Sequence, residues 1–381
     1  MSEWKEYKLG EIAKFISTKV SVQDVNLEDY VSTENMLVDK GGITTATNKP
    51  LNGTITKYYP NNILISNIRP YFKKIWYANK QGGCSNDVLC FGVDVNLVNS
   101  KYLYFLLSQD IFFEYVMLGS KGCKMPRGDK NHIMNWDISL PPLPEQQRIA
   151  SFLSSLDDKI DLLHRENKTL EAMAETLFRQ WFIEETKEDW KEGKLGDFVS
   201  VIDNRGKTPP YTDNITEYPI IEVNALTGED RYVKYNLVKK YVEKDIYDFW
   251  FRGYFHKYDI FVSTVGSIGE LAMCLEEKGV IAQNVIALHA NNISPFYLYQ
   301  YLNYNKDDLK GLDIGSVQPS IKVPHLLNMS IIIPPHDKLK EYDIIMLDII
   351  EKEEKNIKQI QTLIQTRDSL LPKLMSGEIK V

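Results

Sequence analysis

The sequence predicts a mixed α/β protein of the α+β class, in which two globular domains are separated by a long antiparallel two-helix coiled coil. An octamer at residues 4–11 recurs at 190–197. Later landmarks recur in the same order, and a long stretch of heptad-spaced apolar residues follows each globular half. A repeat of about 190 residues indicates a duplicated unit with pseudo-two-fold symmetry, because the repeats of a solenoid are far shorter.

The octamer and three later pairs of landmarks carry this internal repeat. Trp4-Lys5-Glu6-Tyr7-Lys8-Leu9-Gly10-Glu11 returns as Trp190-Lys191-Glu192-Gly193-Lys194-Leu195-Gly196-Asp197. The later pairs are Tyr102-Leu103-Tyr104 with Tyr297-Leu298-Tyr299, Gly119-Ser120 with Gly315-Ser316, and Pro141-Pro142 with Pro334-Pro335. The landmarks predict a first domain at 1–144, a long helix at 145–186, a second domain at 187–335 and a C-terminal helix at 336–381.

Both long stretches carry apolar residues at the three- and four-residue spacing of a coiled coil. The first seam consists of Ile149, Leu153, Leu156, Ile160, Leu163, Asn167, Leu170 and Leu177. The second consists of Met346, Ile349, Ile360 and Leu363, interrupted by Glu353, Asn356 and Arg367. A helix of roughly 55 Å, at about 1.5 Å per residue, outruns an ordinary domain, so we expect the two helices to pair. Asn167 would then fix their register. The alternative is that each helix packs only on its own domain.

The globular halves combine short strands with short helices. The expected strands are 63–66 and 259–262, the expected helices are 101–109 and 295–302, and the expected closing strands are 138–140 and 331–333. Proline pairs end both closing strands. Loops rich in Gly, Asn, Pro and Tyr lie between these elements, and the two halves diverge most in those loops. A common scaffold with divergent loops suits two recognition modules.

Composition argues for a cytoplasmic chain without a membrane span. The sequence contains no run of 18 apolar residues, and its first six residues are too charged for a signal peptide. The four cysteines have no CxxC spacing, which predicts reduced thiols and neither a zinc site nor a disulfide framework. The net charge of −7 counts against DNA binding, although a DNA-binding protein needs only a local basic surface.

Two motifs resemble catalytic signatures but lack their essential parts. The segment 205–208 contains the Gly-Lys-Thr of a phosphate loop, yet Val201 stands where the first glycine is required. Thr208-Pro209-Pro210-Tyr211 resembles the Asp/Asn-Pro-Pro-Tyr motif of adenine methyltransferases, but threonine is a poorer acceptor and no glycine-rich cofactor loop follows a strand. The six histidines are scattered. We therefore predict no catalytic residue and no metal ligand.

Basic loops in the first half are candidates for DNA contact. The loop 121–130 carries cations on a flexible Gly/Pro frame, and 67–74 mixes cations with aromatic residues. The candidate residues are Asn67, Arg69, Lys73, Lys74, Lys121, Lys124, Arg127 and Lys130. A solvated surface loop is the alternative for each.

The second half is less basic at the corresponding positions. The segment 315–322 has one cation, but its glutamine can pair with adenine in the major groove. The segment 204–208 supplies two further cations. The candidates here are Arg205, Lys207, Gln318, Ser320 and Lys322. Divergence between equivalent loops would let the halves read different DNA sequences.

In the order of these motifs, the chain resembles the specificity (S) subunits of type I restriction–modification systems. The resemblance rests on Trp4-Lys5-x-x-Lys8-Leu9-Gly10 and its second copy, Leu64-Ile65-Ser66-Asn67-Ile68-Arg69-Pro70, Leu140-Pro141-Pro142-Leu143-Pro144-Glu145-Gln146-Gln147-Arg148-Ile149, and Gly315-Ser316-x-Gln318-Pro319. It covers both copies and almost the full length. The second copy departs from the pattern where its long helix begins, because 334–339 lacks the Pro-x-Gln-Gln form.

The resemblance implies a non-catalytic subunit that works in a complex. Each target-recognition domain would read one half of a split double-stranded DNA sequence. The helices would set the spacer and dock methyltransferase (M) subunits, expected as a pair. Restriction (R) subunits would join in a complete restriction complex. The chain itself would bind no cofactor, whereas S-adenosylmethionine, ATP and Mg would belong to the partner subunits. The alternative function is a duplicated coiled-coil scaffold for protein interactions, without sequence-specific DNA binding.

Overall fold

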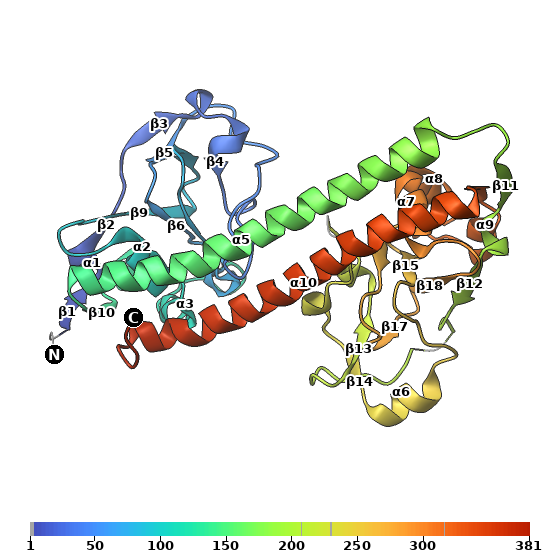
Figure 1. Cartoon of the computed structure of the whole chain (residues 1–381). Coiled ribbons are helices and arrows are strands. Elements are labelled where there is room, and N and C mark those ends of the chain that lie inside the picture. The colour runs from blue at the N-terminus through green and yellow to red at the C-terminus, as the bar shows by residue number, and fades with distance from the viewer. Residues whose placement is uncertain (1–3, 207, 229–230, 316) are drawn as a thin grey trace. The chain divides into compact units, whose positions relative to one another are not determined.

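The computed structural model describes residues 4–206, 208–228, 231–315 and 317–381. The chain divides into two compact units, of which unit 1 comprises Met1–Asp161 with Gln361–Val381 and unit 2 comprises Leu162–Ile360. Each unit therefore contains one globular half and a section of both long helices (Figure 1). The fold is mixed α+β, as the sequence predicted.

Unit 1 contains short helices and three small sheets. Its strands are β1 Lys5–Lys8, β2 Ala13–Phe15, β3 Lys19–Ser21, β4 Tyr30–Val31, β5 Thr54–Tyr58, β6 Ile63–Ser66, β7 Ile75–Tyr77, β8 Gly82–Cys84, β9 Val88–Val93 and β10 Asp137–Leu140. Its short helices are α1 Leu9–Ile12, the 3-10 turn η3 Pro70–Phe72, α2 Ser100–Leu107, α3 Asp110–Leu118 and α4 Lys130–Met134. The long helix α5, Leu143–Arg179, begins in unit 1, and the C-terminal helix α10, His336–Met375, ends there.

The central sheet of unit 1 has the order β2-β9-β6-β7, with all neighbours antiparallel. Its two middle strands, β6 and β9, are almost wholly buried, which suits the unbroken apolar sequence of β6. A second sheet, β3-β5-β8-β4, contains one parallel pair, and β1 pairs with β10. The core places Phe91 of the central sheet with Leu103 of α2, Leu153 of α5 and Leu371 of α10. Both long helices therefore contribute to the core of unit 1.

Unit 2 repeats this plan. Its strands are β11 Lys191–Lys194, β12 Val199–Ile202, β13 Tyr218–Ile221, β14 Tyr241–Val242, β15 Ile260–Ser263, β16 Leu271–Met273, β17 Val280–Ile281, β18 Val285–Ala290 and β19 Ser330–Ile333. Its helices are α6 Lys244–Trp250, α7 Pro295–Tyr304, α8 Lys306–Gly311 and α9 Val323–Leu327. The central order β12-β18-β15-β16 matches that of unit 1, and β11 pairs with β19 as β1 pairs with β10.

The core of unit 2 also combines the sheet with both long helices. It places Leu288 of β18 with Leu298 of α7, Phe178 of α5 and Met346 of α10. The outer sheet is where the units differ most, because β14-β13-β17 in unit 2 replaces the four strands of unit 1. The parallel pair survives the change, as β13 pairs with β17 in the way that β4 pairs with β8. The repeat therefore preserves the central sheet and varies its surroundings.

The two long helices pack together within each unit and run antiparallel. In unit 1 the Arg367 guanidinium of α10 lies 2.9 Å from the Asp157 carboxylate of α5. In unit 2 the Asn356 amide donates to Asn167 Oδ1 at 2.8 Å. The Tyr342 ring lies near Trp181 in the π-turn Gln180–Glu184 that continues α5. The expectation that the helices pair is confirmed, and the alternative that each helix packs only on its own domain is wrong, because the helices contact each other as well as the cores.

The predicted short elements correspond to β6, β15, α2, α7, β10 and β19, each within two residues at either end. Proline pairs follow β10 and β19, and both long helices begin directly after them. Among the described residues, none of the helices combines the length and apolarity that a membrane crossing requires.

Candidate nucleic-acid interface

In unit 1 the two loops that the sequence singled out lie side by side. The Arg69 amide donates to Pro126 O at 2.8 Å, and the Gly128 amide donates to Asn67 O at 3.3 Å. Ile68 and Arg127 form an antiparallel β-bridge. Residues more than fifty positions apart therefore form one paired structure at the end of β6, which we call the unit 1 loop pair (67–74 with 121–130).

Local backbone geometry explains why these residues can pair. Arg69 has a φ of 50°, a left-handed conformation that turns the chain into η3, and Pro70 occupies the first position of that turn. At Gly128 a Cβ atom would lie 2.8 Å from Asn67 Oδ1, so a larger residue would displace the side chains packed around it. Asn67 Oδ1 and Arg69 Nε are buried and have no hydrogen-bond partner among the described residues. These two side chains hold unused hydrogen-bonding capacity at the centre of the loop pair.

Acidic neighbours neutralise much of the positive charge of the unit 1 loop pair. The ion pairs are Lys73 with Asp110 at 2.9 Å, Lys121 with Asp129 at 2.7 Å, and Arg127 with Asp87 at 3.1 Å. The Lys121 hydrogen bond, with backbone donors, holds the pKa of Asp129 at about 2. Lys74 donates to Thr33 O at 2.7 Å, and burial lowers the pKa of its ammonium.

Two cations of the unit 1 loop pair differ from the others. Lys124 is exposed and forms no ion pair with any part of the chain that the structure describes. Lys130 is also exposed, and its ammonium lies 5.7 Å from the centre of the Phe15 ring. Lys124 is therefore the cation of this loop pair that is most available to a phosphate.

Unit 2 contains an equivalent loop pair (264–270 with 313–322). The Gly266 amide donates to Pro319 O at 3.0 Å, and the Ile321 amide donates to Thr264 O at 2.8 Å. Val265 and Ser320 form the antiparallel bridge that Ile68 and Arg127 form in unit 1. The backbone pattern is thus the same, while glycine and serine replace the two arginines. The candidates Gln318 and Lys322 are exposed here, and Ser320 is half-buried.

An aspartate holds the longer loop of the unit 2 pair. Asp313 Oδ1 accepts hydrogen bonds from the backbone amides of Ser320 at 2.9 Å and Gly315 at 2.8 Å. These two bonds lower the pKa of the Asp313 carboxyl. A Cβ atom on Gly315 would lie 1.8 Å from Gln318 O, so the turn is too tight for any other residue. The loop is therefore organised by its own contacts.

The segment 203–206 does not belong to the unit 2 loop pair. Arg205 Nε donates to both carboxylate oxygens of Asp203 at 2.9 Å, and Asn204 Nδ2 donates to Gly253 O at 3.2 Å. Lys207 lies outside the described residues. The sequence reasoning looked for cations and so missed 264–270, which contains none. The recurrence of a buried strand ending in serine, at Ser66 and Ser263, was the signal that could have found it.

The predicted seam residues lie along the two long helices with unequal burial. The buried ones are Ile149, Leu153, Ile160, Leu163, Met346, Ile349 and Ile360, and the half-buried ones are Leu156, Asn167, Leu170, Leu177 and Leu363. The interruptions have partners. Besides bonding to Asn167, the buried Asn356 amide donates to Glu166 Oε2 at 3.0 Å. Polar seam positions are therefore satisfied across the helix pair.

A buried arginine joins the globular half of unit 2 to both long helices. The Arg231 side chain is 1% exposed and lies 3.4 Å from Glu353 of α10 and 3.7 Å from Glu171 of α5. The Tyr232 hydroxyl donates to Glu353. Burial raises the pKa of the Glu353 carboxyl, and the Arg231 charge opposes that rise. Sequence reasoning did not identify this cluster, because nothing local to Arg231 points to residues on the distant helices.

A buried amide performs a related task in unit 1. Gln146, in the first turn of α5, accepts from the Asn99 amide at 2.8 Å and donates to Leu97 O at 3.1 Å and Pro141 O at 2.8 Å. Asn99 is the N-cap of α2. The motif around Gln146 carried the family resemblance, and its structural role is to fasten the start of α5 to the globular half.

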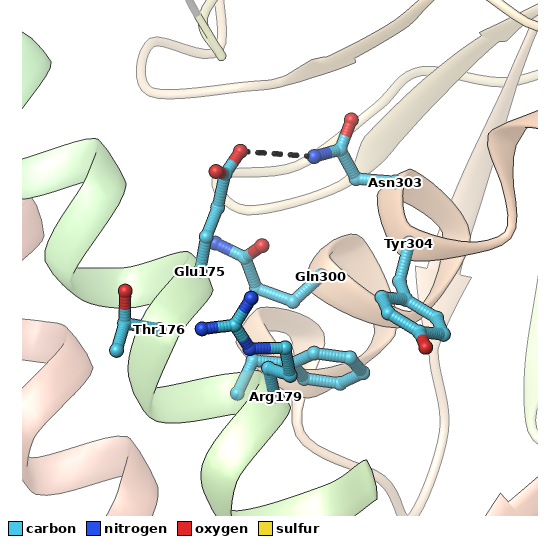
Figure 2. A pocket seen from close by; sticks show the side chains of 7 residues that line it. Glu175, Thr176, Arg179, Gln300, Asn303 and Tyr304 are labelled. Carbon is cyan, nitrogen blue, oxygen red and sulfur yellow. Dashed lines mark hydrogen bonds between the residues drawn. The ribbon is translucent and has the colours of Figure 1, made fainter.

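Unit 2 also holds a pocket of about 260 Å³ between α5 and α7. Its lining consists of Glu175, Thr176, Phe178, Arg179, Gln300, Asn303 and Tyr304. Figure 2 shows Gln300 between Glu175 and Arg179, and Asn303 donating to Glu175 at 3.3 Å. Gln300 is 2% exposed, and its Nε2 has no hydrogen-bond partner among the described residues. The lining that the structure describes contains neither a histidine nor a cysteine.

Two copies of one sheet-and-loop module, each sharing its core with both members of an antiparallel helix pair, define a duplicated recognition scaffold. In the part of the chain that the structure describes, no group of three or more His, Cys, Asp or Glu residues could hold a metal ion. The family described as "Type I restriction modification DNA specificity domain" matches residues 1–172 and again 187–366. The chain belongs to this family, as the sequence resemblance predicted, and is a specificity subunit of a type I restriction–modification system.

Similar proteins come from the same class. The chain is 28% identical to the "Type I restriction enzyme MjaIX specificity subunit" of Methanocaldococcus jannaschii over 308 residues, which are 74% of this chain and 70% of that protein. It is 26% identical to the MjaVIII specificity subunit of the same organism over 427 residues, which cover 100% of this chain and 93% of the relative. Specificity subunits are non-catalytic and work in a complex with methyltransferase and restriction subunits.

A solved structure shares the fold. The crystal structure of the type I restriction–modification S subunit from M. genitalium has a TM-score of 0.61 and 16% sequence identity, and the similarity covers 97% of this chain and 96% of that one. At this identity the likeness concerns the fold alone.

Proposed function

We propose that this specificity subunit reads a bipartite double-stranded DNA sequence, with each globular half reading one half-site through its loop pair. Both loop pairs are made by the same two backbone hydrogen bonds and the same β-bridge. The side chains on that shared frame differ, with Arg69 and Arg127 in one unit and Gly266 and Ser320 in the other. This combination of a constant frame and variable side chains is the observation that carries the proposal.

The loop pairs offer both kinds of contact that DNA recognition requires. The exposed Lys124 and Lys130 supply positive charge for phosphates, and the exposed Gln318 can pair with an adenine edge. Internal ion pairs and the net charge of −7 limit the attraction of the isolated chain for DNA. We therefore expect weak, salt-sensitive binding by the chain alone and tight binding only with partner subunits.

The long helices are proposed to set the spacer and to dock two methyltransferase subunits. Both helices take part in the core of each unit, so their length couples the two globular halves. The contacts of Asn167 with Asn356 fix one register of the pair. S-adenosylmethionine would be held by the methyltransferase subunits, and ATP and Mg by restriction subunits where these are present.

Methylome sequencing of cells that express the chain with its methyltransferase subunit tests the proposal. We expect a split motif with an unread spacer. Gly315→Ala should weaken the sequence preference only in the half-site that unit 2 reads, because the new Cβ atom would collide with Gln318 O. Gly311→Ala is the matched control, because the space around Gly311 is open.

Insertion of seven residues in both helices, after Asp161 and after Ile360, should lengthen the spacer by about three base pairs at about 1.5 Å per residue.

Some outcomes would overturn the proposal. A contiguous motif, or half-sites whose bases change when the helices are lengthened, would contradict the split-reading arrangement. Methylation without any sequence preference would favour the alternative, a protein-interaction scaffold. Filter binding of random-sequence DNA in the presence of the methyltransferase subunit distinguishes these cases independently of the cell.

A further inference from the structure

The longer loop of each pair contains a five-residue tip that begins with glycine and ends with proline. Tip 1 is 122–126, and tip 2 is 315–319, with position 316 outside the described residues. Lys121 and Arg127 close tip 1 by exchanging two backbone hydrogen bonds of 2.9 Å. The Ile314 amide closes tip 2 by donating to Ser320 O at 3.0 Å. The ends of the two tips are therefore closed by hydrogen bonds at equivalent positions in each unit.

Each tip exposes an apolar side chain next to a polar one. In tip 2 Val317 is 99% exposed and Gln318 follows it. In tip 1 Met125 is 49% exposed and Lys124 precedes it. The order is reversed between the tips, but the combination is the same. A single exposed apolar residue is ordinary on a protein surface, whereas its recurrence beside a polar reader on equivalent tips indicates a shared use.

The two ends of tip 2 are held by hydrogen bonds within unit 2. Asp313 accepts hydrogen bonds from the amides of Gly315 and Ser320 at the two ends of the tip, and Gly315 permits its tight turn. Pro319 is constrained in φ, and its carbonyl accepts a hydrogen bond from the Gly266 amide. Val317 adds a β-branched side chain with a single stiff rotatable bond. Contact through Val317 would therefore cost little conformational entropy, so most of the free energy of apolar burial would appear as affinity.

We infer that Val317 reads the C5 methyl group of a thymine in the major groove of the half-site that unit 2 recognises. This inference rests on the proposed function. The thymine methyl is the one apolar group that a base edge presents in the major groove, and small apolar side chains contact it. Gln318 beside Val317 has the donor and acceptor that match an adenine edge. An apolar side chain and an amide in sequence thus suit a half-site rich in A·T pairs.

Uracil substitution tests the inference directly, because deoxyuridine differs from thymidine only by the missing methyl. The complex of the chain with its methyltransferase subunits is titrated with duplexes in which each thymine of the target is replaced singly by deoxyuridine. For the wild type we expect one replacement, in the unit 2 half-site, to weaken binding about fourfold, the effect of burying about one methyl group. In the Val317→Ala complex that thymine-to-uracil ratio should fall to about one.

Two controls separate the inference from general damage. Ile215→Ala removes another apolar side chain of unit 2, 85% exposed, and should keep the fourfold ratio. Val317→Ala should leave every ratio in the other half-site unchanged, since Val317 is fully exposed and contributes no core contact. A sequence-specific complex in which no uracil replacement matters, or in which Val317→Ala keeps the ratio, overturns this inference alone. A wild-type complex without sequence preference overturns the proposed function as well.

Discussion

Unit 1 and unit 2 share the order of their central strands and the pairing of their loops, but they differ in where ionised side chains lie. Among the described residues of unit 1, the buried polar side chains are neutral, and the ion pairs are formed by partly or fully exposed side chains, several of them at the loop pair. Unit 2 buries Arg231, Asp259 and Glu353, and its loop pair has three charged residues, Glu270, Asp313 and Lys322. The repeat therefore constrains the backbone, while the placement of charge changed freely between the copies.

The junction between each globular half and its long helix also keeps the same backbone arrangement with different side chains. Gln146 stands four residues after the second proline of its pair, and Leu339 holds the equivalent place in unit 2. Unit 2 instead uses Asp343, which accepts a hydrogen bond from Ser294, the N-cap of α7. Both copies thus tie the first part of a long helix to the N-cap of the equivalent short helix, with different residues at different positions.

The largest effect is expected from breaking the buried charge cluster of unit 2. Arg231→Met leaves the Glu353 carboxylate buried without its cation, which costs about 3–5 kcal/mol. Hydrogen exchange of the backbone amides in β15 and α7 measures the loss, and the amides of unit 1 serve as the internal reference. Because burial already raises the pKa of Glu353, protonation compensates the variant, so the deficit should shrink as the pH falls towards about 4.

Two further variants sharpen the contrast between buried and surface charge. The triple variant Arg231→Met, Tyr232→Phe, Glu353→Leu removes every polar member at once and should return to within about 1 kcal/mol of the wild type. In unit 1, Arg367→Met breaks the partly exposed pair with Asp157 and should cost about 1 kcal/mol or less. Equal losses from Arg231→Met and Arg367→Met would show that burial does not distinguish the units.

A smaller effect is expected at the junction of unit 1. Gln146→Leu introduces the residue that unit 2 has at the equivalent position. It leaves the Asn99 amide and two backbone carbonyls without their hydrogen-bond partner, which should lower the free energy of unfolding by about 2 kcal/mol. Hydrogen exchange in α2 reports this loss. Gln147→Leu is the matched control, because Gln147 is exposed and its replacement should change stability by less than about 0.5 kcal/mol. Indistinguishable results for the two glutamines would remove the assigned role of Gln146.

The sequence predicted the structural features that depend on a local residue pattern or on the internal repeat. The heptad spacing from Ile149 onward predicted a long paired helix, and the recurring landmarks predicted two copies of one fold. The contact of Arg231 with Glu353 could not be predicted from the sequence, because 122 positions separate the two residues and no periodicity links them. Gln146 could be seen in a motif, but its three backbone partners depend on how the chain returns to α5.

The loop pairs show where a search for charge succeeds and where it misleads. In unit 1 the cations marked both loops, although the ion pairs of Lys73, Lys121 and Arg127 reduce what those cations offer to DNA. In unit 2 the same search selected Arg205, which pairs with Asp203, and passed over 264–270. Backbone equivalence to unit 1 is the better guide, because the frame is conserved between the copies while the charges are not.

The smallest effect concerns the salt dependence of DNA binding by the complex with methyltransferase subunits. Lys124→Ala removes an exposed cation from tip 1, and if Lys124 contacts one phosphate, the slope of log affinity against log salt concentration should fall by about 0.9. Between 50 and 200 mM salt this change amounts to about 3.5-fold in affinity. Lys121→Ala should change the slope less, because Asp129 already neutralises Lys121, and Val317→Ala should not change it. If Lys124→Ala instead alters the base preference of one half-site at an unchanged slope, Lys124 reads a base, and the assignment of phosphate contact to tip 1 is wrong.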